Sequence, residues 1–138
     1  GLQAAILNAK LPYILEWTEM RIDKAKLYRK YLSGISELIL PKQRDNTIHS
    51  YHLFIVRSRF RDRLAIWLKS KNIEVSIHYP TALPNLPAYE YLKTEQEDFP
   101  VATGLQNEIL SLPIYPELSE EEISYIADAI KEFYKNEI

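Results

Sequence analysis

A strand, a helix and a second strand follow one another between residues 51 and 79, and this order constrains the fold more than any other stretch. The first segment, "YHLFIVR" (51–57), is a nearly unbroken apolar run of strand-forming residues, typical of a central strand covered on both faces. The second, "SRFRDRLAIWLKSKN" (58–72), repeats apolar residues every three or four positions, as a helix packed on one side does. The third, "IEVSIHY" (73–79), alternates apolar and polar residues and predicts another strand. The fold class is therefore α/β.

Capping residues mark the ends of two expected helices. Ser58 can cap the start of the 58–72 helix, and Asn72 suits the left-handed position at its end. Near the C-terminus, Ser119 followed by Glu122 has the pattern of a capping box. The residues expected to form the buried stripe of that last helix, with Leu118 packing on the first of them, are Ile123, Ile126, Ala127, Ile130 and Phe133.

A long helix is expected at the N-terminus, running through Pro12. Proline there lacks an amide hydrogen and clashes with the carbonyl of Asn8, so the helix should be kinked. Its start has no capping residue before Leu2, which suggests that the chain was cut from something larger. The apolar stripe that predicts this helix consists of Leu2, Ile6, Ala9, Tyr13, Trp17, Met20, Leu27 and Tyr31.

Five of the eight prolines lie between Pro80 and Pro113, so the irregular part of the chain is concentrated there. Short helices are expected at "PAYEYLK" and "FPVATGLQNEIL", and a short strand at "LSLPI", where Pro113 confines the strand to a sheet edge or a strand end. The whole pattern predicts a small sheet of about three strands flanked by helices, preceded by the long kinked N-terminal helix.

Composition excludes several classes of function. The 138 residues suit one compact domain, and the formal charge of −2 gives no overall basic field to attract nucleic acid or an anionic membrane. No stretch is long and apolar enough for a membrane span, and the absence of cysteine suits a cytoplasmic setting. Three glycines provide no phosphate-binding loop, and three histidines make no case for a metal site.

His78 and Tyr79 are the candidate site residues, because they end a strand and precede a proline-rich loop. The alternation of this strand puts His78 on the face opposite its apolar residues. Pro80 and the prolines that follow stiffen the loop, which suits the presentation of polar side chains at a fixed place. An exposed strand residue and a hydrogen-bonded core histidine remain alternative interpretations of His78. His49 and His52, in or beside the first strand, are interpreted as structural.

Two charged clusters accompany this candidate. The arginines Arg57, Arg59, Arg61 and Arg63 have two interpretations, a solvated face and a phosphate site, of which the first is favoured. The glutamates at 120–122 begin a helix and are interpreted as partners of its dipole, with no catalytic role.

Several segments in this order resemble the C-terminal part of nucleotide-sugar aminotransferases of the DegT/DnrJ/StrS group, which are PLP-dependent enzymes of fold-type I. They are "GLQAAILNAKLPYILEWTEMR", "HLFIVR", "RDRLAIWLKSKNIEVSIHYPTALPNLPAYEYL", "FPVA" and "EILSLPIYPELSEEEI". The resemblance covers essentially the whole chain. It implies that residues 1–138 are the C-terminal small domain of a larger aminotransferase, with an interdomain helix at 1–33 and an α/β subdomain at 34–138.

The resemblance also implies a function. The complete enzyme would transfer an amino group from glutamate to a nucleotide-linked keto-sugar, for amino-sugar and polysaccharide biosynthesis, as a homodimer. PLP would be held by a missing N-terminal domain that carries the Schiff-base lysine. No catalytic, cofactor-binding or metal-binding residue is expected in this chain, which alone should be inactive and should not bind PLP.

In such enzymes the His-Tyr-Pro loop lies over the mouth of the active site, which implies that His78 and Tyr79 bind the nucleotide-sugar. Many members continue with a second proline and a second histidine, where this chain has Ala82 and Pro84. A role for a second histidine is therefore not carried over. The alternative is a free-standing α/β ligand-binding or regulatory module that uses the His78 loop and the arginine cluster to hold an anionic ligand or a nucleic acid, of which the net charge disfavours the second.

Overall fold

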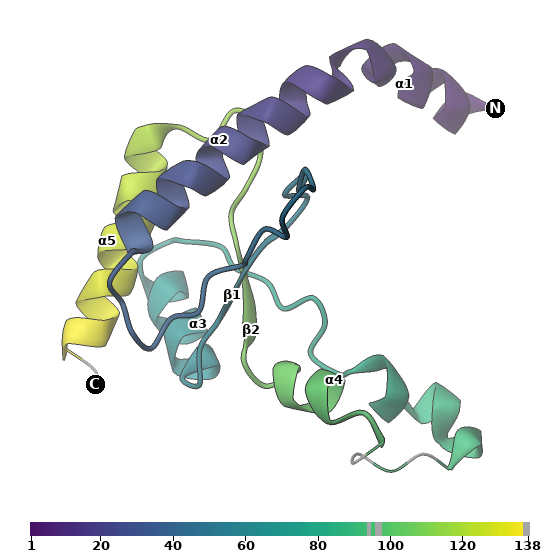
Figure 1. Cartoon of the computed structure of the whole chain (residues 1–138), viewed down its shortest axis with the longest axis vertical. Coiled ribbons are helices and arrows are strands. Elements are labelled where there is room, and N and C mark those ends of the chain that lie inside the picture. The colour runs from purple at the N-terminus through teal and green to yellow at the C-terminus, as the bar shows by residue number, and fades with distance from the viewer. Residues whose placement is uncertain (94, 96–97, 137–138) are drawn as a thin grey trace.

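The computed structural model describes residues 1–93, 95 and 98–136 of the chain (Figure 1). The helices and strands in chain order are α1 (Leu2–Lys10), η1 (Leu11–Tyr13), α2 (Ile14–Leu32), β1 (Phe54–Arg57), α3 (Arg61–Ser70), η2 (Leu83–Asn85), η3 (Pro87–Leu92), α4 (Pro100–Leu105), β2 (Ile109–Leu112) and α5 (Glu120–Asn136). The expected α/β class and the long N-terminal helix are confirmed. Among the described residues, no helix is both long enough and apolar enough to cross a membrane.

The N-terminal helix bends at Pro12. A 3₁₀ turn, η1, separates α1 from α2 and contains Pro12, whose missing amide hydrogen is tolerated there (Figure 1). No residue of α1 is buried, and α1 projects away from the rest of the molecule. The buried residues of α2 are Ala25, Tyr28 and Leu32, whereas Leu27 and Tyr31 of the expected stripe are only half-buried. In this half of the helix the buried face is thus shifted by one residue from the predicted stripe. A shift of one residue corresponds to a rotation of about 100° around the helix axis.

In the described part of the chain the sheet has two strands, so the prediction of about three is wrong. Strands β1 and β2 pair antiparallel, with Arg57 opposite Ile109. From the expected strand at 73–79, Ser76 alone forms a bridge to β2, opposite Ser111. The next hydrogen-bonded pair in this register would place Glu74 opposite Pro113, which has no amide hydrogen to donate. Pro113, directly after β2, therefore prevents the pairing from continuing toward Glu74.

The two faces of the sheet differ in burial. The core face carries Phe54 and Val56 of β1 with Leu110 and Leu112 of β2, all buried. The other face, here called the open face, carries the alternate residues of both strands: Ile55, Arg57 and Ile109, which are half-buried, and Ser111, which is buried. The expectation that the 51–57 segment is covered on both faces is wrong, because β1 begins at Phe54 and its open-face residues are only half-buried.

The core lies between the core face and three helices, α2, α3 and α5. Figure 1 shows α2 beside α5, and the Trp67 indole N–H of α3 donates to the carbonyl of Ala129 in α5 at 2.8 Å. The five stripe residues predicted for α5 are all buried, as is Leu118. The capping box is confirmed, since the Ser119 amide donates to the Glu122 carboxylate at 2.8 Å and the Glu122 amide to the Ser119 hydroxyl at 3.1 Å.

The prediction that Ser58 caps the start of this helix is wrong, because α3 begins at Arg61 and its N-cap position is Phe60, without a side-chain cap hydrogen bond. The Ser58 hydroxyl instead accepts the Phe60 amide at 3.0 Å in the turn before the helix. Other end signals hold. Asn72 has a φ of 59°, in the left-handed region. Pro87 and Pro100 are the first residues of η3 and α4. The helices η2, η3 and α4 form a separate lobe on the side of the sheet away from α5 (Figure 1).

Candidate functional site

His78 lies at the open face of the sheet. Ser76 pairs with Ser111 of β2, so His78, two residues further on, faces the same side as Ser76. The Nδ1 atom of His78 is 2.8 Å from the hydroxyl oxygen of Ser111, and the imidazole is half-buried. The alternation that predicted a face opposite the apolar residues is confirmed, because Val75 and Ile77 pack against the core.

Tyr79 is exposed beside His78. Its side chain keeps 73% of its accessible surface, and its ring meets the His78 ring edge-on with the centroids 5.7 Å apart. The peptide bond between the two residues is cis. The His78 imidazole, anchored to the sheet, and the exposed Tyr79 phenol therefore lie next to each other on the same surface.

The loop after Tyr79 is fixed by Gln106, which follows α4. The Gln106 side-chain oxygen accepts the Ala82 amide at 2.7 Å and the Asn85 side-chain amide at 3.3 Å. The Gln106 carbonyl in turn accepts a guanidinium hydrogen of Arg61 at 3.1 Å. Stiffness of this loop therefore comes from side-chain hydrogen bonds as well as from its prolines.

Ser111 and Gln106 are the positions that sequence reasoning missed. Ser111 is a polar residue inside an otherwise apolar strand, and this contrast was a usable signal for a buried hydrogen bond. Gln106 gave no such signal, because a glutamine after a short helix is ordinarily exposed. Its role depends on a loop that is more than twenty residues away in the chain.

The four arginines of the predicted cluster do not form one surface. Arg61 is 7% exposed, and its guanidinium donates to the carbonyls of Gln106 and Ile109 at 3.1 and 3.3 Å, so it connects α3 to the start of β2. Arg57 pairs with Glu108 at 2.8 Å. The guanidinium of Arg59 lies 5.1 Å from the Phe60 ring centroid, and that of Arg63 lies over the rings of Phe60 and Phe133. Neither a phosphate site nor an entirely solvated face describes them.

The other two histidines lie away from His78. His49 accepts the Tyr51 amide at Nδ1 over 2.9 Å and stacks on the Tyr51 ring at 4.2 Å, which is a structural arrangement. His52 is exposed. In the described part of the chain, no group of three or more histidines and carboxylates could hold a metal ion.

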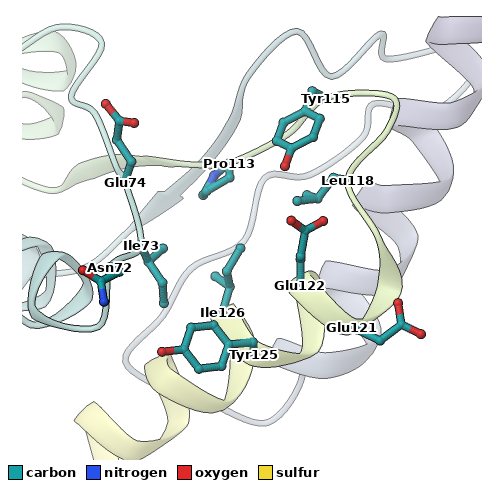
Figure 2. Close-up of a pocket in the computed structure, with 10 residues that line it drawn as sticks. All are labelled: Asn72, Ile73, Glu74, Pro113, Tyr115, Leu118, Glu121, Glu122, Tyr125 and Ile126. Carbon is teal, nitrogen blue, oxygen red and sulfur yellow. The ribbon is translucent and has the colours of Figure 1, made fainter.

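A cavity of about 660 Å³ opens at the start of α5 (Figure 2). The residues lining it include Ile73, Leu118 and Ile126 with three glutamates, Glu74, Glu121 and Glu122. Figure 2 shows the Glu122 carboxylate pointing toward Tyr115. Burial, followed by the nearby charge of Glu122, raises the pKa of the Tyr115 phenol.

This cavity is separate from His78 and Tyr79, neither of which lines it. Glu74 of the cavity precedes His78 by four residues along an extended segment, or about 13 Å. Two polar groups at the cavity are already engaged, since Glu122 belongs to the capping box and the Tyr125 hydroxyl donates to the Lys71 carbonyl at 3.0 Å. His78 and Tyr79 therefore remain the candidate site.

The chain is similar to known aminotransferases along nearly its whole length. The model of the DegT/DnrJ/EryC1/StrS aminotransferase family matches residues 1–131. The pleiotropic regulatory protein of Geobacillus stearothermophilus is 36% identical over 98% of this chain and 37% of its own length. The dTDP-3-amino-3,6-dideoxy-alpha-D-galactopyranose transaminase of Aneurinibacillus thermoaerophilus is 34% identical over 96% of this chain and 36% of its own length.

A solved structure has the same fold. DesV from S. venezuelae, in complex with a ketimine intermediate, superposes with a TM-score of 0.91 and 30% identity over 97% of this chain. The match covers 36% of the DesV chain. The chain thus spans little more than a third of the length of the relatives that it matches.

Proposed function

Because this chain belongs to the DegT/DnrJ/EryC1/StrS aminotransferase family, we propose that it is the C-terminal small domain of a nucleotide-sugar aminotransferase. The complete enzyme transfers an amino group from glutamate to a nucleotide-linked keto-sugar, for amino-sugar and polysaccharide biosynthesis, as a cytoplasmic homodimer. Residues 1–33 form its interdomain helix and residues 34–138 its α/β subdomain. The observation that carries this proposal is a match of nearly the whole chain to about a third of a transaminase of dTDP-amino-sugars.

PLP, the cofactor of this chemistry, supplies an electron sink at the carbon that gains or loses the amino group. The described residues do not fit this cofactor, because each of the lysines is exposed or half-buried, including Lys69, which lines a cavity of about 580 Å³. Lys71, one of the less exposed, is paired with Glu132 at 3.0 Å. The PLP site is therefore assigned to the rest of the enzyme, and this chain alone is inactive.

His78 and Tyr79 are the proposed substrate-binding residues of this domain. Tyr79 is exposed, His78 is anchored by Ser111, and Gln106 fixes the loop behind them, so both rings can meet a ligand with little further ordering. A phenol and an imidazole suit the hydroxyl and phosphate oxygens of a nucleotide-sugar. They position the substrate and take no proton from it.

The free-standing binding module is less well supported. A module of this kind would use the arginine cluster for an anion, but Arg61 is buried and Arg57 is paired with Glu108. The family model matches residues 1–131, as expected of a domain inherited with the enzyme.

The test is amino transfer by the protein encoded by the complete reading frame. The enzyme is given PLP, 2-oxoglutarate and a panel of dTDP-, UDP- and GDP-linked amino-sugars, and glutamate formation is measured. We expect glutamate from one of these sugars, none from the 138-residue chain, and a raised KM for the sugar in the His78→Ala variant. Glutamate formation by the 138-residue chain alone would refute the domain assignment.

The Tyr79→Phe variant separates binding from folding. It keeps the ring and removes one exposed hydroxyl, so we expect a raised KM with unchanged thermal stability. An unchanged KM in both the His78→Ala and the Tyr79→Phe enzymes would remove these residues from the site.

A further inference from the structure

The contact between His78 and Ser111 anchors the imidazole and also determines which of its two nitrogens holds the hydrogen. We propose that Ser111 is a positioning residue: its hydroxyl donates to Nδ1 of His78 and so holds the imidazole in the tautomer whose Nε2–H donates to the nucleotide-sugar. This inference rests on the proposed function, and it adds both the residue that orients His78 and the direction of its hydrogen bond.

Ser111 is rigidly placed. Its side chain is 5% exposed, in the middle of the sheet. Its backbone exchanges two hydrogen bonds with Ser76, the Ser111 amide donating at 2.8 Å and the Ser76 amide at 3.3 Å. On the other side of β2, Ile55 of β1 lies directly opposite Ser111. Because the backbone of Ser111 is held on both sides by strand pairing, its hydroxyl can fix the direction of a ring that contacts it.

The direction of the hydrogen bond follows from the donors available. In the described part of the chain, the Ser111 hydroxyl has its hydrogen-bond contact with His78 Nδ1, at 2.8 Å. If Nδ1 carried the hydrogen, the buried hydroxyl hydrogen would have no acceptor, which is unfavourable. The hydroxyl therefore donates to Nδ1, and in the neutral imidazole the hydrogen is on Nε2.

The result is a donor at a defined position. Within the described residues Nε2 of His78 makes no hydrogen bond, and the imidazole is half-exposed beside the exposed Tyr79. An Nε2–H group recognises an acceptor oxygen, such as a phosphate or hydroxyl oxygen of the substrate. Without Ser111, both tautomers would be populated, and part of the molecules would present an acceptor there instead.

The first experiment reads the tautomer directly. The protein is labelled with ¹⁵N-histidine and its ring nitrogens are observed by NMR at about pH 8. His78 is assigned from the signals missing in the His78→Gln variant. We expect the Nε2–H tautomer in the wild type, a mixture in Ser111→Ala, and the wild-type pattern in Ser111→Thr and in the control Ser76→Ala. The Nδ1–H tautomer in the wild type would overturn the proposal without any variant of Ser111.

The second experiment asks whether the tautomer matters for substrate binding in the complete enzyme. We expect Ser111→Ala to raise the KM for the nucleotide-sugar about fivefold with kcat nearly unchanged, and Ser111→Thr to restore it. In a His78→Ala background the Ser111→Ala change should add little, because the two residues act together.

The two arms distinguish the possible failures. If His78→Ala raises the KM and Ser111→Ala leaves it unchanged, Ser111 does not position His78 and this inference is overturned while the proposed function stands. If neither variant changes the KM but the tautomer shifts in Ser111→Ala, the hydrogen bond is real and the substrate role of His78 is wrong.

Discussion

At the scale of single residues, the hydroxyl groups of two tyrosines link segments that lie far apart in the chain. The Tyr28 hydroxyl donates to the Pro113 carbonyl at 2.8 Å, and the Tyr134 hydroxyl lies 2.6 Å from that of Ser58. Each bond joins a helix to the segment at a strand end. None could be predicted from spacing along the chain, because the partners are separated by 85 and 76 residues.

Replacing Tyr28 with phenylalanine should reduce the free energy of unfolding by about 1 kcal/mol at neutral pH, since it removes one buried hydrogen bond. Burial raises the pKa of Tyr28 above the ordinary phenol value of 10.0, so the folded state keeps its proton after the unfolded chain has lost it. The wild type should therefore lose stability as the pH rises above 10, by up to about 1.4 kcal/mol per pH unit for this proton.

Urea unfolding between about pH 8 and pH 11 measures this effect. The Tyr28→Phe variant should lose stability less steeply than the wild type, while the control Tyr91→Phe, at an exposed position, should follow the wild type. Parallel curves for the wild type and Tyr28→Phe would show that the phenol does not titrate with unfolding.

Replacing Gln106 with alanine should loosen the loop after Tyr79, because the Ala82 amide loses its acceptor. We expect amide hydrogen exchange at Ala82 to accelerate at least about fivefold, with little change at the core amides of β2. The exposed neighbour Asn107 provides the control, as Asn107→Ala should leave exchange at Ala82 unchanged. Equal exchange in all three proteins would assign the stiffness of the loop to its prolines alone.

At the scale of elements, the sequence predicted a helix best where the two residues that bond each other lie within one turn of the chain. The α5 helix was predicted with its capping box and its buried stripe because Ser119 and Glu122 bond each other within one turn. The 73–79 segment has equally good strand periodicity, yet it contributes one bridge. Its partner for a further pair toward Glu74 would be Pro113, a residue far away in the chain that has no amide hydrogen.

Substituting Ser119 with alanine should cost about 1 kcal/mol of the free energy of unfolding, because one amide at the start of α5 loses its acceptor. Chemical denaturation measures the cost, and Ser119→Asp should restore most of the stability. A stable Ser119→Ala protein would mean that burial of the stripe alone sets the start of α5.

The same cap gives an acid dependence. The amide and hydroxyl of Ser119 lower the pKa of Glu122 in the folded protein below 4.5. The ionised carboxylate therefore stabilises the fold fully at a pH above the pKa that Glu122 has in the unfolded chain. This stabilisation is lost as the pH falls through the lower pKa of the folded protein. Glu122→Gln should remove this part of the acid dependence, whereas Glu132→Gln, also on α5, should not.

At the scale of the whole molecule, the main feature is a helix with no core contacts. No residue of α1 is buried, and Leu2, Leu7 and Leu11 in this region keep 79%, 68% and 64% of their accessible surface. A row of exposed apolar side chains on a projecting helix favours association with another apolar surface.

Replacing Leu7 and Leu11 together with glutamate should weaken self-association of the 138-residue protein, as measured by sedimentation at increasing concentration. The melting temperature should remain nearly unchanged, because neither side chain belongs to the core. Ile66→Glu, an exposed apolar position on α3, is the matched control and should leave association as it is in the wild type. Association that persists in the double variant would place the contact surface elsewhere.

The sequence alone determined the fold class, the long bent helix, the capping box and stripe of α5, and the face of the sheet to which His78 belongs. These features depend on helix and strand periodicity and on contacts within one turn, both of which involve residues that are close together in the sequence. Tertiary structure decided that the sheet has two strands, that Arg61 is buried, and that Ser111 and Gln106 hold His78 and its loop. Those outcomes depend on pairs of residues far apart in the chain, whose contact exists only once strand register and helix packing bring them together.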